Sequence, residues 1–353
     1  MKKDIKTLLR PNIAVLTPYS TARDEFKGVA EVFLDANESA YPTGFNRYPD
    51  PRQRVLKEVI SKVEGVATES LFLGNGSDEA IDIILRVFCT PGVHNAVAIN
   101  PSYGMYEVSA AINDVQLRKV DLYDDFSLDY DNLIAASDSY TRVVFLCSPN
   151  NPTGNTIDLS QIKMLADDLN AIIVVDEAYI HYSPYESAVS LINDYNNIVV
   201  LRTLSKARGM AGLRVGMAVA DPYIIEVMSM VKYPYNLSQA TINEALNQLQ
   251  PEKVEIIKAQ IVETIAERAR LKEALEKLDS VRYVYPSDAN FLLVKVDNAD
   301  DMYDYLVARG IIVRNRNRVY GCKNCLRITV GLPAENDRLL KTIEEYEKET
   351  DNN

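Results

Sequence analysis

The sequence predicts an α/β fold: a mostly parallel central sheet with helices on both faces, followed by a smaller α+β C-terminal domain. Short apolar runs alternate with helical patterns from about Leu71 to Val219, as in a parallel sheet built from strand–helix–strand units. Most runs are β-branched and apolar throughout, as expected for strands covered on both faces. After Pro251 the pattern changes to a long, charged, amphipathic helix and then to mixed strands and helices.

The individual elements follow from these runs in chain order. Strands of the central sheet are expected at Leu71–Leu73, Ala96–Ile99, Arg142–Cys147, Ala171–Val175, Ile198–Leu201 and Val215–Ala220. Helices between them are expected at Ser77–Phe88, Ser102–Ala111 and Leu159–Leu169. The C-terminal part is expected to hold helices at Glu252–Leu278, Ala299–Arg309 and Glu335–Glu349, and strands at Asn290–Val296, Ile311–Arg314 and Leu326–Val330.

The N-terminal segment differs from the rest, because it is rich in Pro and Tyr and has weak periodicity. It resembles an arm that packs on another surface. We therefore expect an arm over residues 1–28, a large domain over 45–249, and a small domain formed by 29–44 together with 250–353.

Composition and charge narrow the possible partners. A chain of 353 residues can bury the cores of two domains. Its net charge of −12 gives no electrostatic case for binding nucleic acid or an anionic membrane surface. No apolar run reaches the roughly 18 residues of a membrane span, and the start of the chain lacks the apolar region of a secretory signal. A cytoplasmic protein is expected.

The cysteines do not form the pattern of a disulfide framework in a chain of this length. Cys322 and Cys325 form a lone Cys-x-x-Cys pair, and a zinc site would need two further ligands. Neither His94 nor His181 is near them in the sequence. We expect a loop with two reduced thiols and no metal.

Lys206 lies in the stretch Thr203-Leu204-Ser205-Lys206, which is followed by a Gly-rich turn and by Arg214. A buried lysine amine can form a Schiff base with an aldehyde. Hydroxyls, backbone N–H groups and an arginine beside it would suit the phosphate of that aldehyde compound. The stretch suggests pyridoxal 5′-phosphate bound through Lys206, whereas a lone lysine in a solvated loop would be the simpler interpretation.

Four further motifs follow predicted strands. In Gly74–Glu79 the glycines permit a tight turn, and the next helix offers N–H groups to a phosphate. Tyr103 could stack on a planar ring. Asn151, held between two prolines, could donate a hydrogen bond at a strand end, where ligands of open α/β sheets bind. Asp176 could keep a pyridine nitrogen protonated, with Tyr179 near the phenolic oxygen. Each alone could be an ordinary turn or helix cap, but all lie at strand ends of one sheet.

The motifs Asn-Asn-Pro-Thr-Gly, Val-Asp-Glu-Ala-Tyr and Ser-Lys-x-x-x-Met-Ala-Gly-Leu-Arg-x-Gly resemble those of the fold-type I PLP-dependent aminotransferases of class I/II. Within these, the chain is similar to the histidinol-phosphate aminotransferases, from about residue 10 to the end. That narrower similarity lies in Leu16–Tyr19, Leu34–Glu38, Arg47–Asp50, Gly74–Glu79 and Cys325–Gly331.

The resemblance implies a role for each matching residue. Lys206 carries the cofactor and moves the proton, Asp176 pairs with the pyridinium, and Tyr103 stacks on the ring. Asn151 and Tyr179 bond the phenolic oxygen. The remaining cofactor-binding positions are Gly76, Ser77, Asp78, Thr203, Ser205 and Arg214. Tyr48 is implied to reach the cofactor phosphate of the other subunit, so that the active unit is a homodimer.

Arg327 corresponds to the arginine that binds the α-carboxylate of the substrate. Glutamate carries a carboxylate and histidinol phosphate a phosphate ester at that place, and one arginine can serve both anions. Arg314 and Tyr19 are expected to assist with the substrate phosphate, and Asn37 is a further expected substrate-binding residue. Arg316 and Arg318 are expected to lie in a solvated basic loop.

The expected reaction is transamination of L-histidinol phosphate with 2-oxoglutarate to imidazole acetol phosphate and L-glutamate, in histidine biosynthesis. An aromatic or broad-range aminotransferase is the alternative within the class, and kcat/KM for histidinol phosphate against phenylalanine separates the two. A PLP lyase or decarboxylase would not depend on a keto acid. A PLP-binding regulatory module is the non-enzymatic alternative, although no DNA-binding segment is visible.

Overall fold

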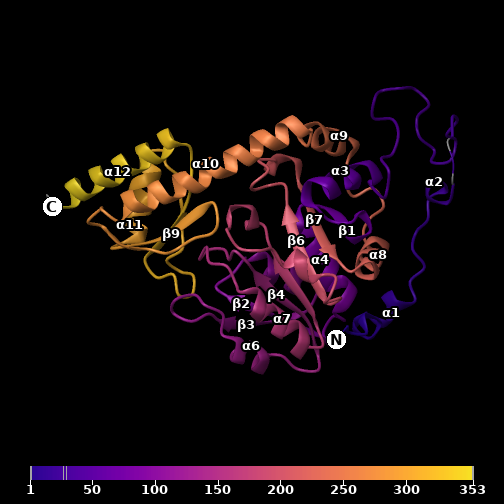
Figure 1. Cartoon of the computed structure of the whole chain (residues 1–353), viewed down its shortest axis with the longest axis horizontal. Coiled ribbons are helices and arrows are strands. Elements are labelled where there is room, and N and C mark those ends of the chain that lie inside the picture. Colours follow the sequence, from indigo (N-terminus) through magenta and orange to yellow (C-terminus); the bar gives the residue numbers. More distant parts are fainter. Residues whose placement is uncertain (1, 27, 29, 352–353) are drawn as a thin grey trace.

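The structure of the protein is a computed structural model that describes residues 2–26, 28 and 30–351. It contains a seven-stranded sheet in the order β1-β7-β6-β5-β4-β2-β3 and a four-stranded sheet in the order β10-β11-β9-β8. Figure 1 shows the four-stranded sheet with α11 and α12 at one end of the molecule and the N-terminal arm at the other, with the long helix α10 running between them. This arrangement is the expected α/β fold with a smaller C-terminal α+β part.

The seven-stranded sheet and its helices occupy the middle of the chain. The strands are β1 (Leu71–Asn75), β2 (Asn95–Asn100), β3 (Gln116–Asp121), β4 (Thr141–Cys147), β5 (Ile172–Asp176), β6 (Ile198–Thr203) and β7 (Val215–Ala220). The helices are α3 (Arg54–Glu64), α4 (Ser77–Phe88), α5 (Met105–Ile112), α6 (Tyr130–Ala136), α7 (Leu159–Asp168), α8 (Pro222–Val231) and α9 (Gln239–Gln248). Two short helices, α1 (Pro11–Ala14) and α2 (Ala22–Glu25), belong to the arm.

The C-terminal part begins with α10 (Pro251–Leu275) and ends with α12 (Pro333–Asp351). Between them lie β8 (Val281–Val284), β9 (Phe291–Val296), α11 (Ala299–Ala308), β10 (Arg314–Asn315) and β11 (Cys325–Thr329). The predicted strand at Ile311–Arg314 is wrong in its placement, because the chain joins the sheet only where Arg314 pairs with Arg327. Strands β3 and β8 were not predicted, since both lie at sheet edges and expose polar side chains instead of forming apolar runs.

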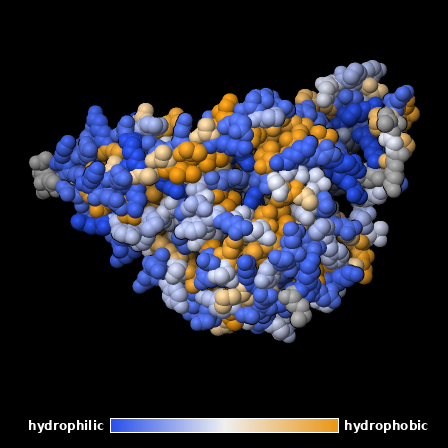
Figure 2. Space-filling view, viewed as in Figure 1, coloured by the Kyte–Doolittle hydropathy of each residue, from blue (hydrophilic) through white to orange (hydrophobic). Residues whose placement is uncertain are grey.

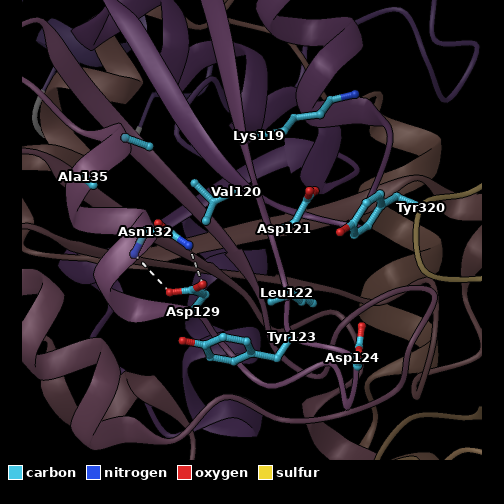
Figure 3. A pocket seen from close by; sticks show the side chains of 11 residues that line it. Lys119, Val120, Asp121, Leu122, Tyr123, Asp124, Asp129, Asn132, Ala135 and Tyr320 are labelled. Carbon is cyan, nitrogen blue, oxygen red and sulfur yellow. Dashed lines mark hydrogen bonds between the residues drawn. The ribbon is translucent and has the colours of Figure 1, made fainter.

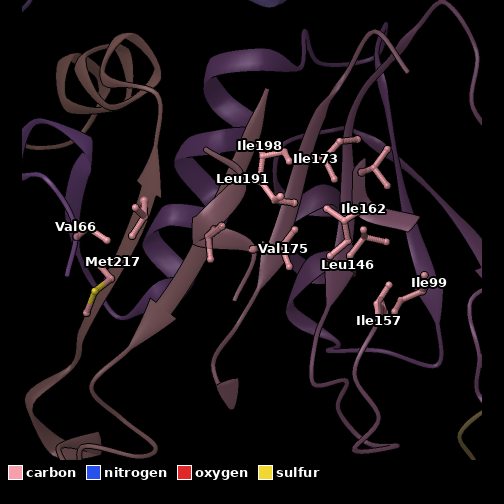
Figure 4. Packing of buried hydrophobic residues seen from close by; sticks show 14 of the residues in the cluster. Val66, Ile99, Leu146, Ile157, Ile162, Ile173, Val175, Leu191, Ile198 and Met217 are labelled. Atoms are coloured by element: carbon pink, nitrogen blue, oxygen red, sulfur yellow. The ribbon is translucent and has the colours of Figure 1, made fainter. Parts of the chain in front are cut away.

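Alternate residues of the central strands enter two separate cores. Val144 and Ile173 belong to one buried cluster, and their neighbours Val143 and Ile172 belong to the other. Figure 4 shows the first cluster, in which Leu146, Ile173 and Val175 lie together. Because strand side chains point alternately to opposite faces, both faces of the sheet are buried, and the sheet is a rigid platform for the loops at its edge.

Strand β7 runs antiparallel to both of its neighbours, β1 and β6. It pairs Val215 with Asn75 on one side and Gly216 with Thr203 on the other. The turns that follow β1 and β6 therefore meet at the start of β7. A Cβ atom on Gly216 would lie only 2.0 Å from the backbone nitrogen of Ser77, so the two turns can approach this closely only because position 216 is a glycine.

A buried ion network lies beneath these turns. Glu64, the last residue of α3, accepts hydrogen bonds from Arg202 Nη1 and Arg208 Nη2, both at 2.8 Å, and lies 3.2 Å from His181 Nε2. Arg202 Nε also donates to Glu177 at 3.2 Å. Side chains at these positions are almost fully enclosed, so each charge depends on its partners. The network connects α3 to the segments after β5 and β6.

The N-terminal arm is held by a second group of ion pairs. Glu38 accepts hydrogen bonds from Arg47 at 2.7 Å and from the Tyr48 backbone at 2.6 Å, and it pairs with Arg23. The Tyr48 ring stacks on Tyr235 with the ring centres 4.5 Å apart. Residues 30–48 thus lie beside the chain that leads into α9, while the domain bounds given above stay a prediction.

Apolar groups reach the surface on the face shown in Figure 2, where they gather around the junction of α9 and α10. Ile256 and Val262 of α10 are more than half exposed. No helix within residues 2–26, 28 and 30–351 combines the length and the apolar character that a bilayer crossing requires.

Replacing Glu64 with Gln is expected to lower the free energy of unfolding by roughly 3 kcal/mol at neutral pH, since two buried arginines would lose a carboxylate partner. Burial alone would raise the pKa of Glu64, but the hydrogen bond to His181 and the charges of Arg208 and Arg202 hold this pKa well below its ordinary value. The stabilisation is present above the unfolded pKa of about 4.3 and is lost as pH falls below it. The difference between wild type and variant should therefore shrink in acid.

Urea denaturation at several pH values measures this difference. Glu58→Gln is the matched control, because Glu58 lies on the same helix and is exposed; its effect should stay within about 0.5 kcal/mol. Equal stability of the two variants at neutral pH would contradict the role given to the Glu64 network.

Candidate active site

A cavity of about 600 Å³ lies where the predicted motifs meet. Its wall includes the ends of β4, β5 and β6, the start of α4, and residues of β10 and β11, so both sheets contribute to it. The structure brings these sequence-predicted residues together around it: Ser77, Asp78, Tyr103, Asn151, Asp176, Tyr179, Thr203, Ser205, Lys206, Arg214, Arg314 and Arg327. Gly76 lies directly behind Arg214.

Asp176, the last residue of β5, forms the buried acidic part of the cavity. Its carboxylate accepts hydrogen bonds from the Tyr106 hydroxyl at 2.8 Å and from the Ala178 N–H at 3.1 Å. Burial raises the pKa of Asp176 to about 6, although both hydrogen bonds lower it. A carboxylate held in this position could pair with a positively charged ring nitrogen.

Tyr106 is a site residue that the motifs did not indicate. It is fully buried in α5 and stacks on Phe145 with the ring centres 4.7 Å apart. It belongs to no predicted motif, and its sequence signal is limited to its place three residues after Tyr103, within the predicted helix Ser102–Ala111. Its contact with Asp176 bridges 70 positions of the chain, which no local pattern could show.

The opposite end of the cavity is suited to a phosphate. Ser77 is the first residue of the 12-residue helix α4, so the N–H groups there have no partner within the helix. The Arg214 guanidinium lies beside it, and among the described residues its hydrogen bonds are all long: 3.5 Å to Ser205 Oγ, 3.4 Å to the Ala211 carbonyl and 3.4 Å to Asp78. A Cβ on Gly76 would lie 2.6 Å from Arg214 Nη2. A phosphate would fit here, because the first N–H groups of α4 and the Arg214 guanidinium can donate hydrogen bonds to it and Gly76 leaves room for it.

Lys206 lies between these two ends. Its Nζ is 5.6 Å from the centre of the Tyr179 ring, and that ring packs edge-on against Phe291 of β9. Partial burial and then the charge of Arg327 lower the pKa of Lys206, while Asp176 opposes the shift. An amine with a lowered pKa is a better nucleophile and base near neutral pH.

Arginines line the side of the cavity formed by the smaller sheet. Arg314 and Arg327 are cross-strand partners in β10 and β11, and Arg327 donates a hydrogen bond to the Asn151 side-chain oxygen. Arg316 also lines the cavity and is half-buried. The expectation that Arg316 lies in a solvated loop is therefore wrong, because the chain just after β10 stays paired with β11 through the Arg316 N–H and the Cys325 carbonyl. Arg318 is exposed, as expected.

Tyr19, Asn37 and Tyr48 are not brought to this cavity within one chain. Tyr19 is 74% exposed. Asn37 and Tyr48 line a separate hollow beside Leu237. The role expected for Tyr48 concerns the other subunit, which a single chain does not test, and the roles of all three residues stay predictions.

A second hollow, of about 650 Å³, lies along the edge strand β3 and contains none of the predicted residues. Figure 3 shows its carboxylates, among them Asp121 and Asp129. Asp129 accepts hydrogen bonds from Asn132 at the start of α6, and Asp121 accepts one from Asn100. These carboxylates hold local structure, and the chemistry is concentrated in the Lys206 cavity.

Known proteins are similar to this chain in sequence and in fold. A family model described as aminotransferase class I and II matches residues 19–343. A histidinol-phosphate aminotransferase of Parabacteroides distasonis is 51% identical over 341 residues, covering 97% of this chain and 98% of the relative.

Solved structures give the same result for the fold. The histidinol-phosphate aminotransferase from Clostridium acetobutylicum has a TM-score of 0.78 and 25% identity, with 87% of this chain and 92% of that chain covered. The one from Sinorhizobium meliloti, in complex with pyridoxal-5′-phosphate, has a TM-score of 0.73 and 23% identity, with 88% and 90% covered.

These matches agree with the geometry of the cavity, which offers an amine between a buried carboxylate and a phosphate-binding turn. They confirm the predicted fold-type I architecture, the predicted cofactor and the predicted class of enzyme, a PLP-dependent transaminase. The chain belongs to the class I and II aminotransferases and, within them, to the histidinol-phosphate aminotransferase family.

Proposed function

We propose that this enzyme transfers the amino group of L-histidinol phosphate to 2-oxoglutarate, reversibly, giving imidazole acetol phosphate and L-glutamate in histidine biosynthesis. The observation that carries the proposal is the cluster of Arg314, Arg316 and Arg327 on the far side of the Lys206 cavity. Both amino donors carry an anionic group that such a cluster can bind. An aromatic amino acid offers a single carboxylate, so the broad-range alternative leaves most of this positive charge without a partner.

The cofactor contacts are proposed from the same cavity. Pyridoxal phosphate, when bound, supplies an electron sink for the electrons of the substrate Cα–H bond. Ser77, Thr203, Ser205 and Arg214 would hold its phosphate, beside the space left by Gly76. Asp176 would keep the ring nitrogen protonated, since a buried carboxylate without a cationic partner is costly.

The other side chains act around the reacting carbon. Tyr103 would lie against the ring, with Asp78 holding its hydroxyl at 3.1 Å. Tyr179 and Asn151 would donate hydrogen bonds to the phenolic oxygen. Because the Asn151 side-chain oxygen already accepts a hydrogen bond from Arg327, its amide nitrogen is left to donate. Substrate binding at Arg327 and cofactor binding at Asn151 are therefore connected through one hydrogen bond.

Lys206 is the proposed proton carrier. When a substrate occupies the cavity, the Lys206 amine would take up the proton of the substrate Cα and hold it at Nζ beside the reacting carbon. The lowered pKa of Lys206 favours the neutral form that this step needs. Arg327 fixes the substrate anion so that the Cα–H bond faces the amine.

We also propose that the active unit is a homodimer working in the cytoplasm. Large apolar side chains of the segment that follows the arm are strongly exposed in the single chain, among them Val32, Leu34, Tyr41 and Phe45, and such exposure favours a protein interface. A second copy would cover them and would place Tyr48, and with it Tyr19 and Asn37, near the opposite cavity. All four cysteines are free and buried thiols, which suits a reducing compartment.

A direct assay with histidinol phosphate and 2-oxoglutarate tests the reaction, with phenylalanine as the competing donor. Glutamate formation is expected, with kcat/KM far higher for histidinol phosphate. Lys206→Ala should reduce the rate more than about 100-fold, because it removes the proton carrier, and should abolish the visible absorbance of the attached cofactor. Lys119→Ala, which removes a lysine outside the cavity, is the control. A preference for phenylalanine would contradict the substrate assignment.

Tyr106→Phe tests the role of Asp176. The variant loses a hydrogen bond that favours the carboxylate, so the pKa of Asp176 should rise above its value of about 6. The affinity of the cofactor-free protein for pyridoxal phosphate should fall as pH drops through this pKa, and the midpoint should lie higher in the variant. Absorbance titrations across a pH series measure it, with Tyr182→Phe as a buried control. Identical midpoints would show that Asp176 does not control cofactor binding.

Mixing one weakened and one inactive variant tests the shared site. Tyr48→Ala should weaken activity if Tyr48 serves the partner's cavity, while Lys206→Ala inactivates its own. A mixed dimer then contains one cavity with both defects and one with neither, so activity should reappear after the variants are unfolded and refolded together. If activity stays at the level of the separate variants, either Tyr48 acts within its own chain or the dimer does not form. Sedimentation velocity distinguishes the two explanations, because it shows whether the mixed protein is dimeric.

A further inference from the structure

Arg316 is a charged residue of the cavity for which the resemblance implies no role. Its side chain is half-buried, it lines the cavity, and its Nε is enclosed without a hydrogen-bond partner. Within the described ranges 2–26, 28 and 30–351, the structure gives its guanidinium no ion pair with a carboxylate. A partly buried cation without a partner is costly, so a ligand that supplies negative charge would be bound favourably there.

The sheet fixes where Arg316 points. The Arg316 N–H donates to the Cys325 carbonyl at 2.8 Å and so extends the pairing of Arg314 with Arg327 by one step. Residues two apart on a strand share a face, and diagonal neighbours on paired strands lie within reach of long side chains. Arg314, Arg316 and Arg327 consequently face the same cavity.

The three guanidinium groups also affect one another. Burial and then the charges of Arg327 and Arg314 lower the pKa of Arg316 to about 10, so the group remains charged at neutral pH under repulsion from its neighbours. Arg327 is partnered by Asn151, whereas Arg316 is held by no side chain in the described part of the protein. Three clustered cations are more than a single carboxylate requires, and they match the charge and the three oxygens of a phosphate monoester.

We propose that Arg316 is a specificity-determining residue that binds the phosphate group of the substrate and favours a phosphate monoester over a dicarboxylate. Arg327 is shared by both donors, and Arg316 adds a contact that a phosphate group uses fully and a carboxylate does not, because the phosphate has three oxygens and nearly two charges in one group. The inference rests on the proposed function for the identity of the phosphorylated donor. The phosphate contact of Arg316 can nevertheless be tested separately from that donor.

The test compares Arg316→Gln with Arg318→Gln in the cofactor-loaded enzyme. Arg318 is the matched control, because it lies on the same segment, is exposed and does not line the cavity. Stopped-flow kinetics of each half-reaction give kcat/KM for histidinol phosphate and for glutamate. In Arg316→Gln, loss of a charge-assisted hydrogen bond should lower the ratio of kcat/KM for histidinol phosphate to kcat/KM for glutamate roughly tenfold. Arg318→Gln should leave this ratio unchanged.

Inorganic phosphate supplies a second measurement that does not need histidinol phosphate to be a substrate. It should compete with glutamate in the wild-type enzyme, and its inhibition constant should rise roughly tenfold in Arg316→Gln but not in Arg318→Gln. Equal losses for both donors together with unchanged phosphate inhibition would overturn the inference. If histidinol phosphate is not used at all while phosphate inhibition still depends on Arg316, the proposed function fails and the phosphate contact stands.

Discussion

The antiparallel insertion of β7 between β1 and β6 is the constraint on which the site depends. Two strands that are far apart in the sequence end on either side of β7 because β7 pairs with both. One end supplies Ser77 at a helix start, and the other supplies Ser205 and Lys206. The approach is so close that a side chain at Gly216 would collide with the Ser77 backbone. Sheet topology therefore fixes the spacing between the phosphate-binding turn and the reactive amine before any ligand is present.

Positively and negatively charged side chains alternate around the cavity. Arg214 lies at one end of the cavity, Asp176 at its buried side, and Arg327 with its neighbours at the other end. The chain as a whole carries −12, so anionic substrates must be attracted by these local cations and not by the overall field. Beneath the cavity, Glu64 and Arg208 tie the segment that follows Lys206 to α3. The segment that carries Lys206, the proposed proton carrier, is thus held by a buried ion pair that does not line the cavity.

The cavity is assembled from two sheets, which connects substrate binding to the arrangement of the smaller one. Arg327 reaches from β11 to Asn151 at the end of β4, and Phe291 of β9 packs on Tyr179. A shift of the smaller sheet would move the arginines and loosen both contacts at once. The contacts proposed for donor discrimination and those proposed for cofactor binding consequently involve the same few side chains.

The sequence by itself determined the apolar core strands and the motifs at their ends, because patterns of burial and of turn residues lie in consecutive positions. The cofactor roles proposed for Lys206, Asp176 and Arg214 come from these motifs. The sequence did not reveal Tyr106 or the inward position of Arg316, and it missed the edge strand β3, whose residues are largely polar. Those features depend on contacts between distant segments. Tyr106 of α5 reaches Asp176 at the end of β5 through one hydrogen bond, and Arg316 faces the cavity because a short strand pairs with β11. Such pairings carry no local periodicity, so only the tertiary structure decided them.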